Sequence, residues 1–137
     1  MNHRIYEIMK REEIEEIVSA RIEDAEALLN NSRFDGSVYL CGYAVELGLK
    51  AKICHTLQWE EYPSTGTGSK YKTFKTHDLD VLLHLTGVEK KVRLELLAEW
   101  SIVAQWTPEA RYNPIGKVDE TGAKDMLEST KVLIERL

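Results

Sequence analysis

The stretch GSVYLCGYAVELGLKAKICHTLQ, residues 36–58, decides the fold of this 137-residue chain. Apolar residues fall on nearly every side of the helix that it would form, and a helix of that kind is buried by other helices. Small residues recur in it, at Gly42, Ala44 and Gly48. Because a mid-helix glycine costs about 1 kcal/mol relative to alanine, close packing against neighbouring helices is the simplest compensation. We therefore expect this helix at the centre of an all-helical domain.

Helical periodicity continues on both sides of this stretch, and no alternation of apolar and polar residues predicts a strand. Asp35 is the expected N-cap of the central helix, Asp78 is the expected N-cap of a short helix, and Pro108 stops a later one. Two irregular stretches are expected, at 59–76 and 107–118. The sequence thus predicts a single domain over residues 1–137, with an all-α, up-and-down four-helix bundle and one additional short helix. The predicted helices span 14–29, 36–58, 78–85, 89–106 and 120–137.

The composition limits the classes of function. With 43% hydrophobic and 30% charged residues, the chain fits a folded domain and not a disordered one. A formal net charge of −5 argues against a broad basic surface for nucleic acid but leaves room for a small basic pocket. No apolar run reaches the roughly 18–20 residues that span a bilayer, and residues 1–10 lack the apolar core of a signal peptide.

The two cysteines indicate a reducing compartment. Cys41 and Cys54 lie on the same predicted helix, about 20 Å apart at about 1.5 Å per residue. A disulfide requires Cα atoms within about 7 Å, so the two cannot pair within one chain. We expect a soluble, reduced, cytoplasmic protein without a membrane segment.

Glu46 and Lys50 are the polar exceptions on the central helix. Their spacing of four residues is typical of an ion pair that orients a helix. Burying two charges is costly unless they are well paired, however, and polar residues on a buried helix also line cavities and interfaces. Both interpretations remain open from the sequence.

Three more candidates lie outside that helix. His77 precedes the predicted short helix, where it either only flanks the cap or faces a pocket and titrates near neutral pH. Arg111 and Tyr112 follow a helix end, where they either cap carbonyl groups or contact a phosphate and a base. No histidine or cysteine pair has the spacing of a metal site, and no nucleophile elbow is present. We therefore predict no metal, no cofactor and no assigned catalytic residue.

The chain resembles HEPN domains, whose name abbreviates "higher eukaryotes and prokaryotes nucleotide-binding". The resemblance covers about residues 14–135. It rests on AEALL at 25–29, on RFDGSVYLCGYAVELGLKA at 33–51 with its Glu46 and Lys50, on THDL at 76–79, and on the run from Trp106 through Arg111 and Tyr112 to Pro114.

This resemblance implies a bundle of four to five helices, usually in a homodimer. It also implies that the protein has, as many members of the family do, a partner protein that is a minimal nucleotidyltransferase. Such pairs of proteins resemble toxin–antitoxin systems. The nuclease branch of the family carries an arginine followed four to six residues later by a histidine on a late helix. This chain lacks that spacing.

Two hypotheses about function follow. The first is a binding module for nucleotide, RNA or a nucleotidyltransferase, with Glu46, Lys50, His77, Arg111 and Tyr112 as the candidate ligand-binding residues. The second is a divergent, metal-independent RNase toxin that uses a histidine such as His77 together with Arg111.

Overall fold

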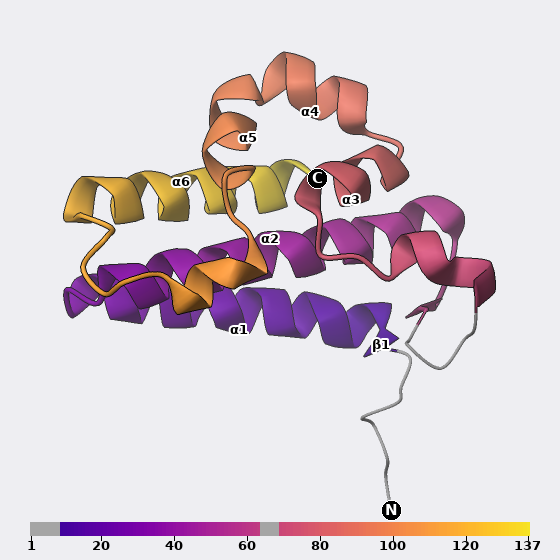
Figure 1. Ribbon diagram of the computed structural model, residues 1–137. Helices are drawn as coiled ribbons and strands as arrows, with labels where there is room; N and C mark the ends of the chain where they lie inside the picture. Colours follow the sequence, from indigo (N-terminus) through magenta and orange to yellow (C-terminus); the bar gives the residue numbers. More distant parts are fainter. Residues whose placement is uncertain (1–8, 64–68) are drawn as a thin grey trace, which may run out of the picture.

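The computed structural model describes residues 9–63 and 69–137. Three long helices lie side by side: α1 (Arg11–Asn30), α2 (Phe34–Leu57) and α6 (Glu120–Arg136). Helix α1 runs antiparallel to α2, and α6 runs in the same direction as α2 (Figure 1). The remaining helices, α3 (Leu79–Leu85), α4 (Glu89–Glu95) and α5 (Leu97–Val103), close the bundle above them. The all-α prediction is confirmed.

Helix α2 occupies the centre of the domain, as its composition predicts. It packs against α1, α3 and α6, and half of its residues are buried. Most of its apolar surface is therefore covered within one chain, although Tyr43 and Leu57 are 37% and 41% exposed. Ile5 and Ile8, apolar residues that precede the predicted first helix, lie outside the described residues.

Two glycines set the distance between α2 and its neighbours. The ring of Trp106 lies against Gly42, where a Cβ atom would overlap it, and the Cδ1 methyl of Ile134 lies against Gly48 in the same way. The interpretation of these glycines as close-packing residues is confirmed.

Asp35 does not cap α2, contrary to the prediction. The N-cap is Arg33, and Asp35 lies inside the first turn. Its carboxylate instead accepts hydrogen bonds from the backbone N–H of Gly116 at 2.6 Å and of Val118 at 3.1 Å. The side chain thus fixes the loop that leads into α6, a long-range role that local sequence does not reveal.

The helix predicted over 89–106 is two helices. The chain breaks at Leu96, whose φ of −127° and ψ of 33° end α4 and start α5. Leu96 is 2% exposed, so the break between the two helices falls on a core residue. In Figure 1, α4 crosses the top of the molecule and α5 turns down toward α6.

The irregular stretches contain short elements that the sequence did not predict. A 3₁₀ helix, η3 (Ser69–Phe74), lies in the first, and another, η4 (Pro108–Tyr112), lies in the second. Strands β1 (Met9–Lys10) and β2 (Glu61–Tyr62) form an antiparallel pair in which Met9 opposes Tyr62. Each strand has two residues, too few to display alternation.

Among residues 9–63 and 69–137, no helix combines the length and the apolar character that a bilayer crossing requires.

Candidate functional site

A pocket of about 510 Å³ opens between the middle of α2, the start of α3 and the segment that follows α5. We call it the Glu46 pocket. Three of the five predicted residues line it, namely Glu46, His77 and Arg111. Its remaining lining residues are Tyr39, Tyr43, Asp78, Leu79, Asp80, Ala104, Trp106, Thr107, Pro108 and Glu109.

Glu46 holds two of the predicted residues in place. Its side chain is 4% exposed, and its Oε2 atom lies 3.0 Å from Nζ of Lys50 and 2.8 Å from Nδ1 of His77. The predicted ion pair between Glu46 and Lys50 is therefore present. Because a carboxylate only accepts, Nδ1 of His77 carries the hydrogen that it donates. This contact leaves Nε2 as the ring nitrogen that is open to a ligand, and the side chain of His77 is 68% exposed.

The start of α3 fixes the backbone next to His77. Asp78 is the N-cap of α3, as predicted, and its side chain accepts hydrogen bonds from the backbone N–H of Asp80 and Val81. Thr76 Oγ1 accepts from the N–H of Asp78 at 3.0 Å. With hydrogen bonds on both sides of it, His77 lies on an ordered turn.

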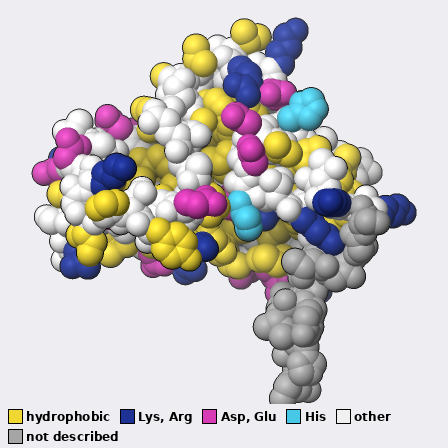
Figure 2. Space-filling view, viewed as in Figure 1, with side chains coloured by type: hydrophobic (Ala, Val, Ile, Leu, Met, Phe, Trp, Pro, Cys, Tyr) yellow, Lys and Arg dark blue, Asp and Glu magenta, His cyan; other side chains and the backbone are white. Residues whose placement is uncertain are grey.

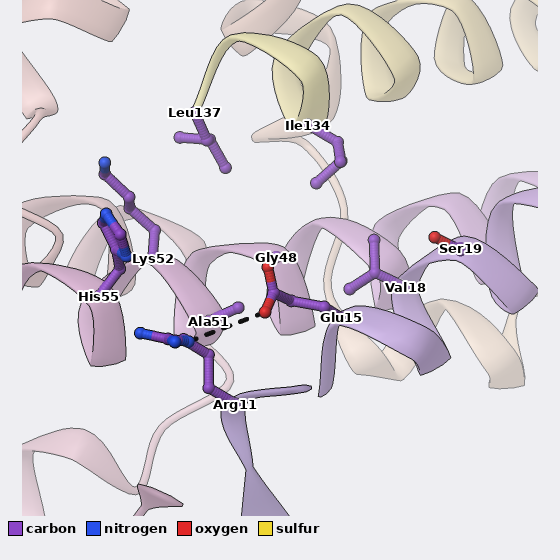
Figure 3. A pocket seen from close by; sticks show the side chains of 10 residues that line it. All are labelled: Arg11, Glu15, Val18, Ser19, Gly48, Ala51, Lys52, His55, Ile134 and Leu137. Atoms are coloured by element: carbon purple, nitrogen blue, oxygen red, sulfur yellow. Dashed lines mark ion pairs between the residues drawn. The ribbon is translucent and has the colours of Figure 1, made fainter. Parts of the chain in front are cut away.

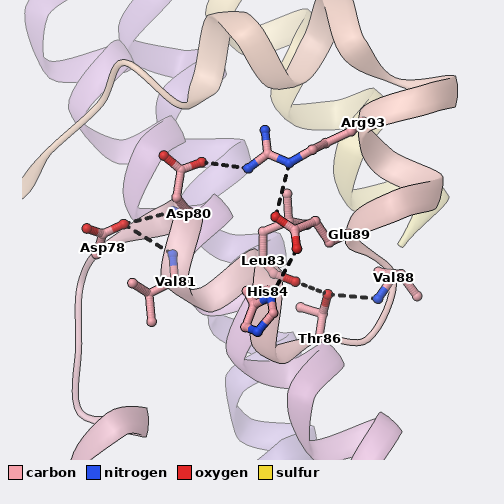
Figure 4. Close-up of polar contacts among 9 residues, drawn as sticks. All are labelled: Asp78, Asp80, Val81, Leu83, His84, Thr86, Val88, Glu89 and Arg93. Carbon is pink, nitrogen blue, oxygen red and sulfur yellow. Dashed lines mark hydrogen bonds and ion pairs between the residues drawn. The ribbon is translucent and has the colours of Figure 1, made fainter.

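A network of ion pairs joins this turn to α4 (Figure 4). Arg93 contacts Asp80 at 3.2 Å and Glu89 at 3.0 Å, and Glu89 also contacts His84. Hydrogen bonds from His84 and Arg93 lower the pKa of Glu89. The network holds α3 against α4, and it leaves the carboxylate of Asp80 with a cationic partner outside the pocket.

Arg111 reaches the pocket from η4, which packs on α2. Its guanidinium lies 4.9 Å from the centre of the Tyr112 ring. Hydrogen bonding to Tyr112 and to Tyr39 raises the pKa of Arg111 above its ordinary value. The guanidinium forms no ion pair with the described residues, so its charge is available to an anion.

Lys50 and Tyr112 do not line the pocket. Lys50 lies behind Glu46, 15% exposed, with Nζ 5.4 Å from the centre of the Tyr62 ring. Tyr112 is 75% exposed and supports Arg111 from outside. Both residues act on the pocket through a neighbour, whereas Glu46, His77 and Arg111 face it directly.

The aromatic wall of the pocket went unrecognised at the sequence level. Tyr39 and Trp106 lie with their ring centres 5.9 Å apart, and Tyr43 is 37% exposed. Burial and the negative charge of Glu46 raise the pKa of Tyr43, so its phenol stays protonated and can donate a hydrogen bond. Aromatic residues on an apolar helix are indistinguishable from core by pattern, although their spacing from Glu46 puts them on its face of α2.

The charge of the pocket is mixed. Four carboxylates line it. Glu46 and Asp80 have cationic partners and Asp78 accepts backbone hydrogen bonds, which leaves Glu109 and Arg111 as the charged groups with neither an ion pair nor a capping role in the described part of the chain. The face seen in Figure 2 likewise carries basic, acidic and hydrophobic side chains interspersed. Such a pocket suits one phosphate beside a base better than a run of phosphates.

Within residues 9–63 and 69–137, no three histidine, cysteine or acidic side chains are grouped so that they could hold a metal ion.

No curated protein and no solved structure matches this chain. A comparison with protein families matches residues 12–137 to the HEPN domain, which is nearly the full length of the chain. The chain therefore belongs to the HEPN domain family.

Proposed function

We propose that the Glu46 pocket binds a single ribonucleotide unit. The observation that carries the proposal is that Glu46, His77 and Arg111, distant in the sequence, line one pocket together with Tyr39 and Tyr43. In this arrangement Arg111 contacts the phosphate and the tyrosine rings stack on the base. His77, which Glu46 orients, and the phenol of Tyr43 present hydrogen-bonding groups to the sugar and the base edge.

Calorimetric titration tests this proposal with AMP, adenosine and inorganic phosphate as separate ligands. Removing a charge-assisted hydrogen bond costs roughly 1.5–3 kcal/mol, so Arg111→Gln should weaken AMP binding about tenfold or more. Adenosine binding should change little, because it lacks the phosphate. The control is Arg136→Gln, which removes an exposed arginine paired with Glu95. Absence of AMP binding, or equal binding by Arg111→Gln, would refute the proposal.

A metal-independent RNase is the second candidate function, and the contact between Glu46 and His77 favours it. A histidine oriented through Nδ1 by a buried carboxylate can accept a proton at Nε2. In such a reaction His77 takes the proton of a ribose 2′-hydroxyl, whose oxygen attacks the adjacent phosphorus while the bond to the 5′-oxygen breaks. The products are a 2′,3′-cyclic phosphate and a 5′-hydroxyl, whose proton comes from water. Arg111 stabilises the charge that develops on the phosphate.

Incubation with total RNA in the presence of a chelator separates the two functions. The RNase hypothesis predicts cleavage that is lost in the His77→Ala, Arg111→Ala double variant and retained in His84→Ala, because His84 lies outside the pocket and is 76% exposed. Binding without cleavage, accompanied by thermal stabilisation on adding nucleotide, leaves the binding module as the function.

We further propose that the protein is a cytoplasmic homodimer that pairs with a minimal nucleotidyltransferase in a toxin–antitoxin-like system. Support comes from membership of the family, from two free buried cysteines, and from large hydrophobic side chains that are exposed in one chain, Leu94, Leu97, Tyr112 and Ile115. Light scattering should give twice the monomer mass at micromolar concentration, and a nucleotidyltransferase reading frame should neighbour the gene. A monomer mass would contradict the first expectation.

A further inference from the structure

A second pocket, of about 360 Å³, lies between α1, the later half of α2 and the end of α6. We call it the Lys52 pocket. Figure 3 shows the residues that line it, which share none with the Glu46 pocket. His55 is nine residues after Glu46, and at about 100° per residue this separation places it on the opposite side of α2. The two pockets therefore face away from each other across one helix.

The floor of the Lys52 pocket is apolar. Val18 from α1 and Ala51 from α2 are 4% and 8% exposed. Gly48 has no side chain, so Ile134 of α6 reaches the surface of α2 there. Together with Leu137, these residues surround a hollow that is built from three helices and not from loops. A hollow of this kind is typical of small-molecule sites, which are concave, mostly apolar and largely pre-formed.

One side of the pocket is cationic. Arg11, Lys52 and His55 lie on the same side in Figure 3. The only side-chain carboxylate in the lining is that of Glu15, which lies 3.8 Å from Arg11. Lys52 and His55 have no ion-pair partner in the described part of the chain. Two cationic side chains, Arg11 and Lys52, thus lie beside an apolar floor in a chain with a net charge of −5.

We propose that the Lys52 pocket binds a small amphipathic anion, a carboxylate or a phosphate monoester carried on a short apolar tail. The head group pairs with Lys52 and Arg11 at the cationic side, and the tail lies on the floor formed by Val18, Ala51 and Ile134. The pocket lacks the tyrosine and tryptophan rings that line the Glu46 pocket, so a nucleotide base has no stacking partner here. This inference is independent of the function proposed for the Glu46 pocket.

The test titrates the full chain with four probes: octanoate, octyl phosphate, 1-octanol and inorganic phosphate. Binding is measured by calorimetry below the concentrations at which the amphiphiles form micelles, and the Cδ1 methyl signal of Ile134 reports the location by NMR. We expect octanoate, octyl phosphate or both to bind at one site and to shift that signal. Whichever head group binds more tightly identifies the class of ligand.

Two variants examine the two parts of the pocket. The Arg11→Gln, Lys52→Gln variant should raise the Kd of the anions about tenfold or more. Ser19→Leu, at an exposed position on the pocket wall, should abolish binding by filling the hollow. The control variant Lys90→Gln, Lys124→Gln removes the same charge from exposed positions elsewhere and should bind as the wild type does.

Four outcomes overturn the proposal: absence of saturable binding by either anion; binding of 1-octanol as tight as that of the anions; binding of inorganic phosphate as tight as that of octyl phosphate; or an equal loss of affinity in the control variant. The first outcome would show that the site does not bind these anions. The second would show that the anionic head group contributes nothing, and the third would show the same for the apolar tail. The fourth would show that binding depends on net charge and not on this pocket.

Discussion

The charged side chains on the two sides of α2 are partnered differently. On one side Glu46 is buried, with its carboxylate bound by Lys50 and His77. On the other side Lys52 and His55 line a pocket without an ion-pair partner among the described residues. The first arrangement stabilises the fold and orients a histidine, whereas the second leaves the Lys52 ammonium group available to a ligand. A single buried helix thus supports two pockets with different chemistry, and substitutions on its two sides should have different consequences.

The largest difference in stability is expected between alanine substitutions of two glutamates, Glu46 and Glu15. Glu46→Ala should lower the free energy of unfolding by about 3–5 kcal/mol, because it leaves the largely buried Lys50 without its partner. Glu15→Ala, which removes a carboxylate that is 61% exposed in the Lys52 pocket, should cost less than about 1 kcal/mol. Urea unfolding measures both.

A double variant sharpens this comparison. Glu46→Ala combined with Lys50→Met should recover part of the loss, since no unpaired charge remains buried. Equal effects of Glu46→Ala and Glu15→Ala would show that burial does not distinguish the two sides.

A smaller difference in stability is expected between alanine substitutions of the two close-packed glycines, Gly42 and Gly48. Gly42→Ala should destabilise the protein by about 1–3 kcal/mol, because its Cβ atom would collide with the rigid ring of Trp106 and force a shift in the core. At Gly48 the collision is with the terminal methyl of Ile134, which can rotate away. The gain of about 1 kcal/mol in helix propensity should then make Gly48→Ala nearly neutral.

Urea unfolding compares these two variants under the same conditions. A Gly48→Ala variant that is destabilised as much as Gly42→Ala would mean that Ile134 is held as rigidly as Trp106.

The smallest effect on stability is expected from the thiols of Cys41 and Cys54. These two thiols of α2 should change the stability with pH in the same direction. Burial raises the pKa of Cys41 and of Cys54 to about 11. In the unfolded chain a thiol ionises near pH 8.5 to 9, so above about pH 9 the folded state keeps a proton that the unfolded state loses. Stability therefore falls as pH rises, by about 1 kcal/mol for each thiol between about pH 8 and about pH 9.5.

Unfolding midpoints across this pH range should be compared with those of the Cys41→Ala, Cys54→Ala variant, which should show a shallower fall. The same slope in both proteins would contradict the assignment of the effect to the thiols.

Much of the fold could be predicted because local signals and packing agree. The apolar stretch of α2 required burial on all sides, and Asp78 caps α3 as its position suggests. The break at Leu96 falls on a core residue that continues the apolar helical pattern, and no glycine or proline marks it. Asp35 resembles an N-cap in the sequence, but its partners lie 81 and 83 residues away.

The site could be predicted only in part, for a similar reason. Glu46 stood out in the sequence because a charge on a buried helix needs an explanation. In the structure its carboxylate contacts Lys50 and His77, two of the other candidates. Tyr39 and Tyr43 did not stand out, because aromatic residues on such a helix are usually core. The Lys52 pocket was missed altogether, since Lys52 and His55 near a helix end resemble ordinary solvated residues.

The central claim, that the Glu46 pocket is the ligand site, is tested most directly by the indole N–H signals of the three tryptophans during an AMP titration. Trp106 lines the pocket and its Nε1 has no hydrogen-bond partner in the described part of the chain, whereas Trp100 lies in the core and Trp59 lines a different hollow. We predict that the Trp106 signal shifts and saturates with the calorimetric Kd, while those of Trp100 and Trp59 stay in place. AMP binding that leaves Trp106 unchanged, or that moves Trp59 instead, would contradict the account.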